Sequence, residues 1–372
     1  MLTYKELKKK TRFLSKSKGI SEISRSHFVN NTFAGDFNYS IGEEPIMRKF
    51  GKYLPIEKNW SCSVSQPCVR ISDFHKEVKK KSLKHLMVFE MSDIGGIHIT
   101  TNSHGDGIRE KSIESAFAFL TEILKIDPRR IYVSYFSGNT LEALSGNKKY
   151  GNKKLPPDDR TPAILRKLGL LEQQLIPDDT AHTFVLTFFP FEFYAGHRNE
   201  IFIKSEENGL LEVGTFEFLN LKTKLNKNGQ LEDVERMEGF FGGCAIGIER
   251  VLMAVNNYPD VFHCDHIFPL YDYILKLSKN RDLTSIHIMC EVLRLLQSIV
   301  SDGYEFSSDN YPKRKIKIKK LILQLVRAAT FLKIDLNAEI DNLLDENAKL
   351  ISWKPAMGIC DNKKIKELIF SF

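Results

Sequence analysis

The chain lacks the features that mark several special classes of protein. Its six cysteines are scattered over 372 residues without regular spacing, so a disulfide framework is not indicated. No apolar run reaches the roughly 18 residues that a membrane span requires, and the basic N-terminus has neither an apolar secretory core nor a small-residue cleavage site. Internal repeats and low-complexity tracts are missing as well. We therefore expect a cytoplasmic globular protein that does not contact a membrane.

Length and charge narrow the class further. A chain of 372 residues is longer than one hydrophobic core usually supports, which predicts two domains. The net charge of +7 is moderate, but six basic residues fall within positions 313–320. The helix predicted over residues 315–332 has apolar residues at helical spacing, so one face is apolar and the other basic. The basic face is either solvated or in contact with phosphate groups.

The order of predicted elements indicates an α+β core followed by helices. We expect a helix over residues 110–124 and strands over 131–135, 184–189, 200–204 and 211–225, the last turned by the hairpin signal at 226–229. Residues 137–179 read as an insertion or lid. Helices follow position 280, and Asn337 is expected to cap a helix that runs through residue 344.

A glycine-rich stretch, residues 242–250, reads G-G-C-A-I-G-I-E-R. Small residues let a strand pass close to a ligand. Arg250 would then open a helix, where its guanidinium can clamp a phosphate by two parallel hydrogen bonds. The alternative is close packing of a strand on a helix, with Arg250 at the surface.

A second arginine lies between two predicted strands, residues 68–73 and 85–91, which are joined by a charged loop. Arg70 can hold a phosphate while Phe89 offers a flat face to a base. The alternative is a surface arginine and a core phenylalanine. His263, Cys264 and His266 could ligate a metal together with Cys244, but their spacing fits no standard zinc pattern.

Five segments together resemble the motifs of class II aminoacyl-tRNA synthetases, in particular those of the alanyl-tRNA synthetase family. They are residues 65–70 (S-Q-P-C-V-R), 85–91 (H-L-M-V-F-E-M), 105–113 (G-D-G-I-R-E-K-S-I), 211–218 (L-E-V-G-T-F-E-F) and 247–250 (G-I-E-R). Their order and rough spacing agree with that family. The resemblance implies an antiparallel sheet flanked by helices, with a catalytic domain over residues 1–274. Residues 275–372 resemble the helical tRNA-recognition region, and the family's editing domain has no counterpart here.

The chemistry implied by this resemblance is the formation of an aminoacyl-adenylate from ATP and an amino acid. Arg70 would hold the α-phosphate and Arg250 the γ-phosphate, and these two are the implied catalytic residues. Phe89 would stack on adenine, and the backbone near Met91 would read its edge. The other implied ATP-binding residues are Arg109, Glu212 and Gly247. Glu200 and Glu212 are the candidate Mg²⁺ ligands, because hard oxygen ligands suit that ion.

The departures from the family lie in the amino-acid pocket, which we assign to Thr215, Glu217 and Gly243. Gly243 stands where the family has an aspartate that holds the substrate's amino group. Gly214 and Thr215 replace a tryptophan–asparagine pair. Glu217 or Glu238 are candidate replacement carboxylates.

A further departure concerns the acceptor, because Ser308 stands where the family has an asparagine that reads the acceptor stem. Candidate tRNA contacts are Lys315, Lys317, Lys319 and Lys320. Three hypotheses follow: a synthetase that charges tRNA, a paralogue that passes an activated amino acid to an amine, a peptide or a carrier protein, and a non-catalytic paralogue. A monomer and a homodimer are both compatible with the resemblance.

Overall fold

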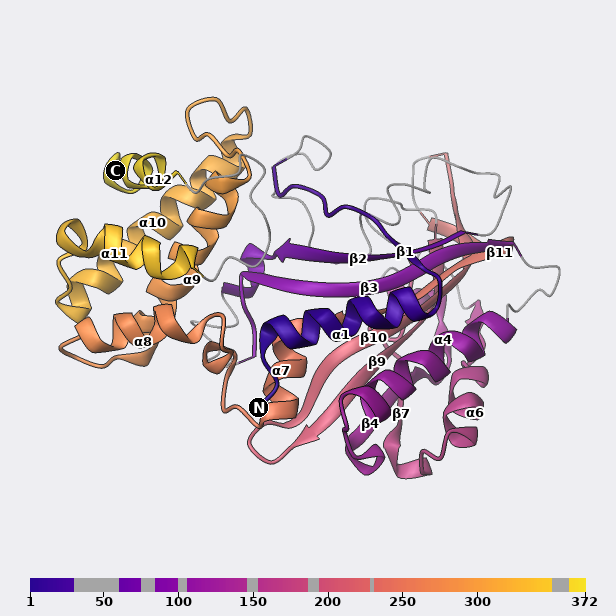
Figure 1. The fold of residues 1–372 in the computed structure, drawn as a ribbon. Helices are drawn as coiled ribbons and strands as arrows, with labels where there is room; N and C mark the ends of the chain where they lie inside the picture. The colour runs from indigo at the N-terminus through magenta and orange to yellow at the C-terminus, as the bar shows by residue number, and fades with distance from the viewer. Residues whose placement is uncertain are drawn as a thin grey trace.

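The computed structural model describes residues 1–29, 60–74, 84–99, 106–145, 153–186, 194–227, 231–349 and 361–372. Within these ranges, a large sheet with helices packed on it forms the first part of the chain, and a group of helices forms the last part (Figure 1). The predicted α+β class, with an all-helical C-terminal part, is confirmed.

In the described ranges nine strands form the main sheet, in the order β1-β2-β3-β11-β10-β9-β4-β7, with β8 beside β9. Their bounds are β1 Ser21–Glu22, β2 Trp60–Val69, β3 Val88–Ile99, β4 Ile131–Phe136, β7 Leu175–Asp178, β8 Phe184–Val185, β9 Tyr194–Ser205, β10 Gly209–Leu225 and β11 Leu231–Gly247. The five central strands, β2 to β9 in that order, are all antiparallel to their neighbours. Parallel pairs occur only toward the ends of this described sheet, between β1 and β2 and between β4 and β7.

Alternation along β11 separates two faces of the sheet. Ala245 and Gly247 belong to one face, and Cys244 and Ile246 belong to the other. The helices α1 (Tyr4–Ser17) and α4 (Asp106–Ala118) cover the face of Cys244, as Figure 1 shows for their position across the strands. The face of Gly247 is therefore the one left for a ligand.

Helix bounds follow local chain chemistry. Helix α1 begins with a capping box, in which Thr3 Oγ1 accepts from the Glu6 amide at 3.2 Å and Glu6 accepts from the Thr3 amide at 2.9 Å. Helix α7 (Ile248–Asn256) starts directly after the glycine-rich end of β11. It stops at Asn257, which adopts a left-handed conformation with φ of 57°.

Several expected boundaries need correction. The helix expected over residues 110–124 begins at Asp106 and passes into a π-helical turn, Phe119–Ile123. Residues 137–179 are more than a lid, because β7 joins the sheet beside β4. The same segment holds β5 (Asn139–Thr140), α5 (Leu141–Ser145), β6 (Lys154–Leu155) and α6 (Arg160–Lys167). Asp335, not Asn337, caps α11, since its carboxylate accepts from the amides of Asn337 and Ala338.

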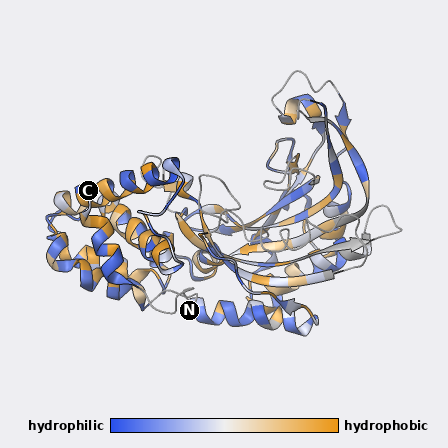
Figure 2. Cartoon of the chain, turned by 90° about the horizontal axis from the view of Figure 1, so that it is seen from above, coloured by the Kyte–Doolittle hydropathy of each residue, from blue (hydrophilic) through white to orange (hydrophobic). Residues whose placement is uncertain are grey.

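The C-terminal part is built around one buried helix. Its members are α8 (Phe268–Leu277), α9 (Leu283–Ser301), α10 (Pro312–Leu332), α11 (Leu336–Ala348) and α12 (Asn362–Phe370). Figure 2 shows hydrophobic and hydrophilic residues on different sides of these helices. Among the described helices, only α9 is long and apolar enough to cross a membrane, and 89% of that window is buried, as in a core helix. The predicted domain boundary at residue 274 falls inside α8.

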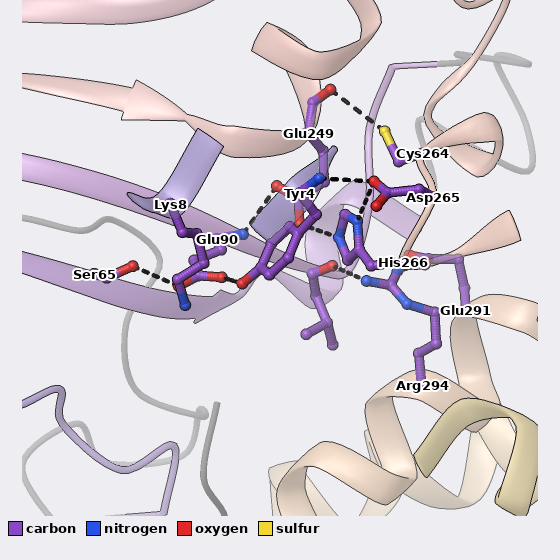
Figure 3. A network of polar contacts seen from close by, with 11 residues as sticks. Tyr4, Lys8, Ser65, Glu90, Glu249, Cys264, Asp265, His266, Glu291 and Arg294 are labelled. Atoms are coloured by element: carbon purple, nitrogen blue, oxygen red, sulfur yellow. Dashed lines mark hydrogen bonds and ion pairs between the residues drawn. The ribbon is translucent and has the colours of Figure 1, made fainter. Parts of the chain in front are cut away.

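Polar contacts tie the C-terminal helices to the strands that lead to the pocket. From α9, the carboxylate of Glu291 accepts from the amide of Met87, and Arg294 donates to the carbonyl of Val88 at 3.0 Å. A second cluster centres on Glu90 of β3, which contacts the hydroxyl of Tyr4 and the ammonium of Lys8 (Figure 3). The strand that carries Phe89 is therefore held on both sides of that residue.

Candidate active site

A pocket of about 580 Å³ opens where β2, β3, β10 and β11 meet the start of α7. Its lining contains eight of the residues singled out from the sequence. They are Arg70, Phe89, Met91, Glu200, Glu212, Thr215, Gly247 and Arg250. Positions more than a hundred residues apart along the chain thus meet in one place.

The β2–β3 pair positions Arg70 next to Phe89. Cys68 lies opposite Phe89 in the antiparallel register, so Arg70 leaves the sheet just beyond it. The Arg70 amide donates to the carbonyl of Met87 at 2.8 Å. The Arg70 guanidinium then lies 5.1 Å from the centre of the Phe89 ring, within reach of a cation–π contact. The two side chains combine a positive charge with a flat apolar surface at one wall of the pocket.

Arg250 approaches from the first turn of α7. Its guanidinium donates to Glu212 Oε1 at 2.9 Å and to the backbone oxygen of Lys84 at 3.3 Å. The side chain is mostly buried, whereas that of Glu212 is 44% exposed. An anionic ligand that enters the pocket can therefore take over Arg250 while Glu212 turns to another cation. A pair of this exposure contributes only about 0–1 kcal/mol, so its exchange costs little.

Glu200 and Glu212 bring two carboxyl groups to the same wall. Burial, and then the nearby charge of Glu212, raise the pKa of Glu200 to about 8. A proton therefore occupies Glu200 at neutral pH when nothing else compensates its charge. Two carboxylates with this mutual repulsion suit a hard divalent cation, which would replace the proton. The donor chemistry fits the predicted Mg²⁺.

Glycines form the sheet surface beside this pocket. A Cβ atom at Gly214 would lie 2.4 Å from the backbone oxygen of Ala245, and one at Gly243 would lie 2.4 Å from that of Ile94. Neither position accepts a side chain without movement of the backbone. The family's tryptophan and aspartate thus have no room on this backbone, so the replacements are changes of shape as well as of charge.

Glu217 lies directly opposite Gly243 in the register of β10 and β11. It is buried, and its Oε1 accepts from Arg198 Nε at 2.6 Å. Its Oε2 has no hydrogen-bond partner among the described residues. Neither Glu217 nor Gly243 lines the pocket itself; they lie on the same sheet face, two residues beyond Thr215 and Ala245. The side chain of Glu238 lies outside the described residues.

Arg109 lies apart from these groups, contrary to its grouping with the ATP-binding residues. It belongs to α4, on the opposite face of the sheet, and its side chain is 4% exposed. The guanidinium donates to Asp158 at 2.8 Å and lies 4.5 Å from the centre of the Phe218 ring. The helix that carries the predicted motif packs this arginine inward, which its sequence pattern did not reveal.

The four candidate tRNA-binding lysines lie on α10, in the C-terminal part. Lys315 donates to the carbonyl of Ser307 at 3.3 Å, and Lys319 lies 4.9 Å from the Phe372 ring centre. Lys319 and Lys320 are exposed, and Lys315 and Lys317 are half-buried. Ser308, on the loop before α10, is exposed and bonds to Glu305. This surface remains separate from the pocket.

The considered zinc site is not formed. The Cys264 thiol is buried and donates to the carbonyl of Glu249 at 3.5 Å, and burial raises its pKa. His266 lies 3.3 Å from the Glu249 carboxylate, and Cys244 lines a cavity on the other face of the sheet. Within the described ranges no three metal-binding side chains converge.

Two carboxylates of this region escaped the sequence argument. Asp93 is completely buried on β3, opposite Ala245 on the ligand face. Glu249 lines the pocket and accepts from the amide of Glu90 at 3.1 Å. Asp93 had a detectable signal, since it alternates with Met91 and Gly95 at positions that the strand pattern assigns to one face. Glu249 is buried by tertiary packing alone.

Comparison with known proteins gives an independent view of the chain. No protein-family model matches it. The alanine–tRNA ligase of Cytophaga hutchinsonii is 23% identical over 286 residues, which is 73% of this chain and 30% of that protein. The alanine–tRNA ligase of Acaryochloris marina is 22% identical over 280 residues, 73% of this chain and 29% of that protein. The chain thus spans about a third or less of the length of these relatives.

Solved structures also show partial likeness. The histidyl-tRNA synthetase of S. aureus has a TM-score of 0.40 at 13% identity and covers 70% of this chain, with 67% of its own length matched. A threonyl-tRNA synthetase structure from Cryptosporidium parvum has a TM-score of 0.42 at 14% identity, over 68% of this chain and 64% of that one. On the sequence relatives, the chain is alanyl-tRNA synthetase-like, with a class II type of antiparallel sheet and a helical C-terminal part.

Proposed function

We propose that the chain activates an amino acid with ATP, forms an aminoacyl-adenylate, and passes the aminoacyl group to tRNA. The observation that carries this proposal is the meeting of Arg70, Phe89 and Arg250 in one pocket, together with two carboxyl groups. Similarity to alanine–tRNA ligases over 73% of the chain supports the same reaction class. Those relatives also suggest that the protein acts in the cytoplasm.

The first step requires charge stabilisation more than a covalent nucleophile. A carboxylate oxygen of the amino acid attacks the α-phosphorus, the bond between this phosphorus and the bridging oxygen breaks, and pyrophosphate leaves with the electron pair. Arg70 would hold the α-phosphate oxygens, and Arg250 the distal phosphate. Such fixed cations act where negative charge develops, and water is largely excluded. Phe89 would position the adenine ring.

Glu200 and Glu212 would hold Mg²⁺. The bound ion supplies charge neutralisation to the phosphates. For Glu212 this requires release of Arg250, which then becomes available to ATP. The present ion pair between these two residues is consistent with an exchange of partners on ATP binding.

Glu217 would receive the substrate's ammonium group in place of the family's aspartate. It faces Gly243 across the strand pair, and one of its carboxylate oxygens has no hydrogen-bond partner among the described residues. A buried acceptor of this kind is costly unless a donor arrives with the ligand. Substrate binding would provide that donor.

In the second step, an acceptor hydroxyl attacks the carbonyl carbon of the adenylate and AMP leaves. The basic surface of α10 supports tRNA as this acceptor. A non-tRNA acceptor is the second candidate, and one observation favours it: Gly214, Gly243 and Ser308 alter both specificity regions while the ATP residues are kept. A non-catalytic role is the weakest candidate because the arginines are in place.

Transfer assays separate the candidates. The chain would be incubated with ATP, Mg²⁺ and each labelled amino acid, with and without total tRNA, and acid-precipitable tRNA ester would be counted. The proposal predicts tRNA labelling that is sensitive to ribonuclease. Activation without any tRNA labelling would replace it by the non-tRNA candidate, and absence of activation would leave only the non-catalytic one.

A further inference from the structure

A second cavity, with a volume of about 1110 Å³, lies away from the candidate active site. Its lining is rich in cations contributed by α4, β6, α6 and β11. The charged side chains among its lining residues are Arg109, Lys153, Lys154, Arg160, Arg236, Asp158 and Asp159. Nothing in the adenylation chemistry uses this cavity.

The two sites are on opposite faces of the same strand pair. His197 of β9 lines the cavity and lies opposite Phe218, whereas Glu200 lines the pocket and lies opposite Thr215. An odd spacing of three residues on a regularly paired strand places the two side chains on different faces. A ligand in this cavity would therefore not occupy the adenylation pocket.

The floor of the cavity is a fixed cationic group. Arg109 is held by Asp158 at 2.8 Å, and the second Asp158 oxygen accepts from Asn199 Nδ2 at 3.2 Å. The same carboxylate accepts from the amides of Arg160 and Thr161 at the start of α6. Arg109 is about nine-tenths or more buried, and its Nε has no hydrogen-bond partner among the described residues. The network thus fixes a guanidinium with one donor left over.

The rim adds further positive charge. Arg160 begins α6 and Arg236 belongs to β11, and the charge of Arg236 is close enough to lower the pKa of Arg160, after burial as the larger cause. Lys153 is paired with Asp233, so Lys154 and the two rim arginines contribute most of the uncompensated charge. Asp158 is already committed to Arg109, which leaves Asp159 as the opposing carboxylate. Two guanidinium groups that repel one another are stabilised by an anion between them.

The remaining wall is apolar. Leu155, Phe184, Leu221 and Val234 line it, together with Pro156 and Pro157. A simple inorganic anion would leave this surface exposed to water, whereas an organic group attached to the anion would cover it.

We propose that this cavity is a second ligand site, which binds the phosphate group of an organic phosphate between Arg160 and Arg236, above Arg109, and packs the organic part against Phe184 and Leu221. Phosphate is favoured over carboxylate because three guanidinium groups from three separate elements can each donate to a different phosphate oxygen. The proposal does not depend on the adenylation reaction.

The test uses the full chain and two probes, uridine 5′-monophosphate and inorganic phosphate, in isothermal titration. The wild type is compared with Arg160→Gln, Arg236→Gln and the double variant. The matched control is Arg166→Gln, which lies on the same helix, is exposed and pairs only with Glu172 among its printed contacts at the surface. Circular dichroism checks that each variant is folded.

We expect binding of the nucleotide to weaken at least tenfold in each single variant and to be lost in the double variant, with the control unchanged. Weaker binding of inorganic phosphate, with the same sensitivity to the variants, would identify the phosphate as the shared element. Absence of nucleotide binding by the wild type, or equal binding by the folded double variant, would overturn the proposal. The variant Arg250→Ala should leave this binding intact, which separates its failure from that of the proposed adenylation site.

Discussion

The two ends of the ligand face differ in what they retain. At the end near α7, Arg70, Phe89 and Arg250 meet in the pattern that the synthetase motifs imply. Toward the middle of β10 and β11, glycines replace the residues that the family uses to select alanine, and Glu217 faces the gap. The difference teaches that the groups suited to the phosphates are separable from those suited to the amino acid. The first set can persist while the second changes.

The sharpest way to break this comparison is to remove the conserved pattern at the phosphate end. Arg70→Ala and Arg250→Ala should each lower ATP–pyrophosphate exchange by about a hundredfold to a thousandfold, since loss of one such donor costs about 2–4 kcal/mol of transition-state stabilisation. Arg166→Ala, at an exposed arginine, is the matched control. Unchanged exchange in both folded variants would show that these arginines do not hold the phosphates.

The second test moves to the C-terminal helices. Replacing Lys315, Lys317, Lys319 and Lys320 together with Glu should weaken tRNA binding by about a hundredfold or more at 50–100 mM salt, because phosphate contacts dominate nucleic-acid affinity. Pyrophosphate exchange should be unaffected, since the pocket lies in the other part of the chain. The matched control is reversal of Lys363 and Lys366 on α12. If filter binding shows no loss, or an equal loss in the control, α10 is not the tRNA surface.

The third test concerns the changed end. Glu217→Gln should raise the KM for the activated amino acid at least tenfold and leave the KM for ATP nearly unchanged, because only the ammonium partner is weakened. Glu172→Gln, at an exposed glutamate paired with Arg166, serves as the control. An equal rise in both KM values would instead indicate a general disturbance of the sheet.

The smallest expected effect is a dependence of stability on pH. The folded-state pKa of Glu200 is about 8, above the ordinary value of 4.5. Its protonated form therefore contributes stability that is fully present below about pH 4.5 and is lost as the pH rises through about 8. Between pH 6 and 9 the metal-free protein should lose a few degrees in Tm relative to Glu200→Gln.

Mg²⁺ with ATP should reduce this loss in the wild type, because the ion takes the place of the proton. A melting temperature with the same pH dependence in the wild type and in Glu200→Gln would show that this carboxyl group does not titrate in that range. Differential scanning fluorimetry in EDTA and in Mg²⁺–ATP is sufficient to measure both effects.

The sequence predicted the pocket better than its surroundings. Arg70, Phe89 and Arg250 were found because each sits at a strand end or helix start, where local sequence determines the direction of the chain. Arg109 was misplaced because its burial depends on Asp158, which lies 49 positions away. The same limit applies to Glu217 and Gly243, whose proximity is a matter of strand register. Helix bounds such as Asp335 depend on which of several polar residues reaches the free amides, and spacing alone does not decide this.

The most direct test of the central claim is ATP–pyrophosphate exchange by the wild-type chain, screened over the standard amino acids in the absence of tRNA. The account predicts exchange with at least one amino acid, and weaker exchange with alanine than with that preferred substrate, because the aspartate position is occupied by Gly243. Strong and exclusive exchange with alanine would contradict the claim that the amino-acid end has changed. No exchange with any amino acid, in a preparation that binds ATP, would contradict the claim that this pocket forms an adenylate.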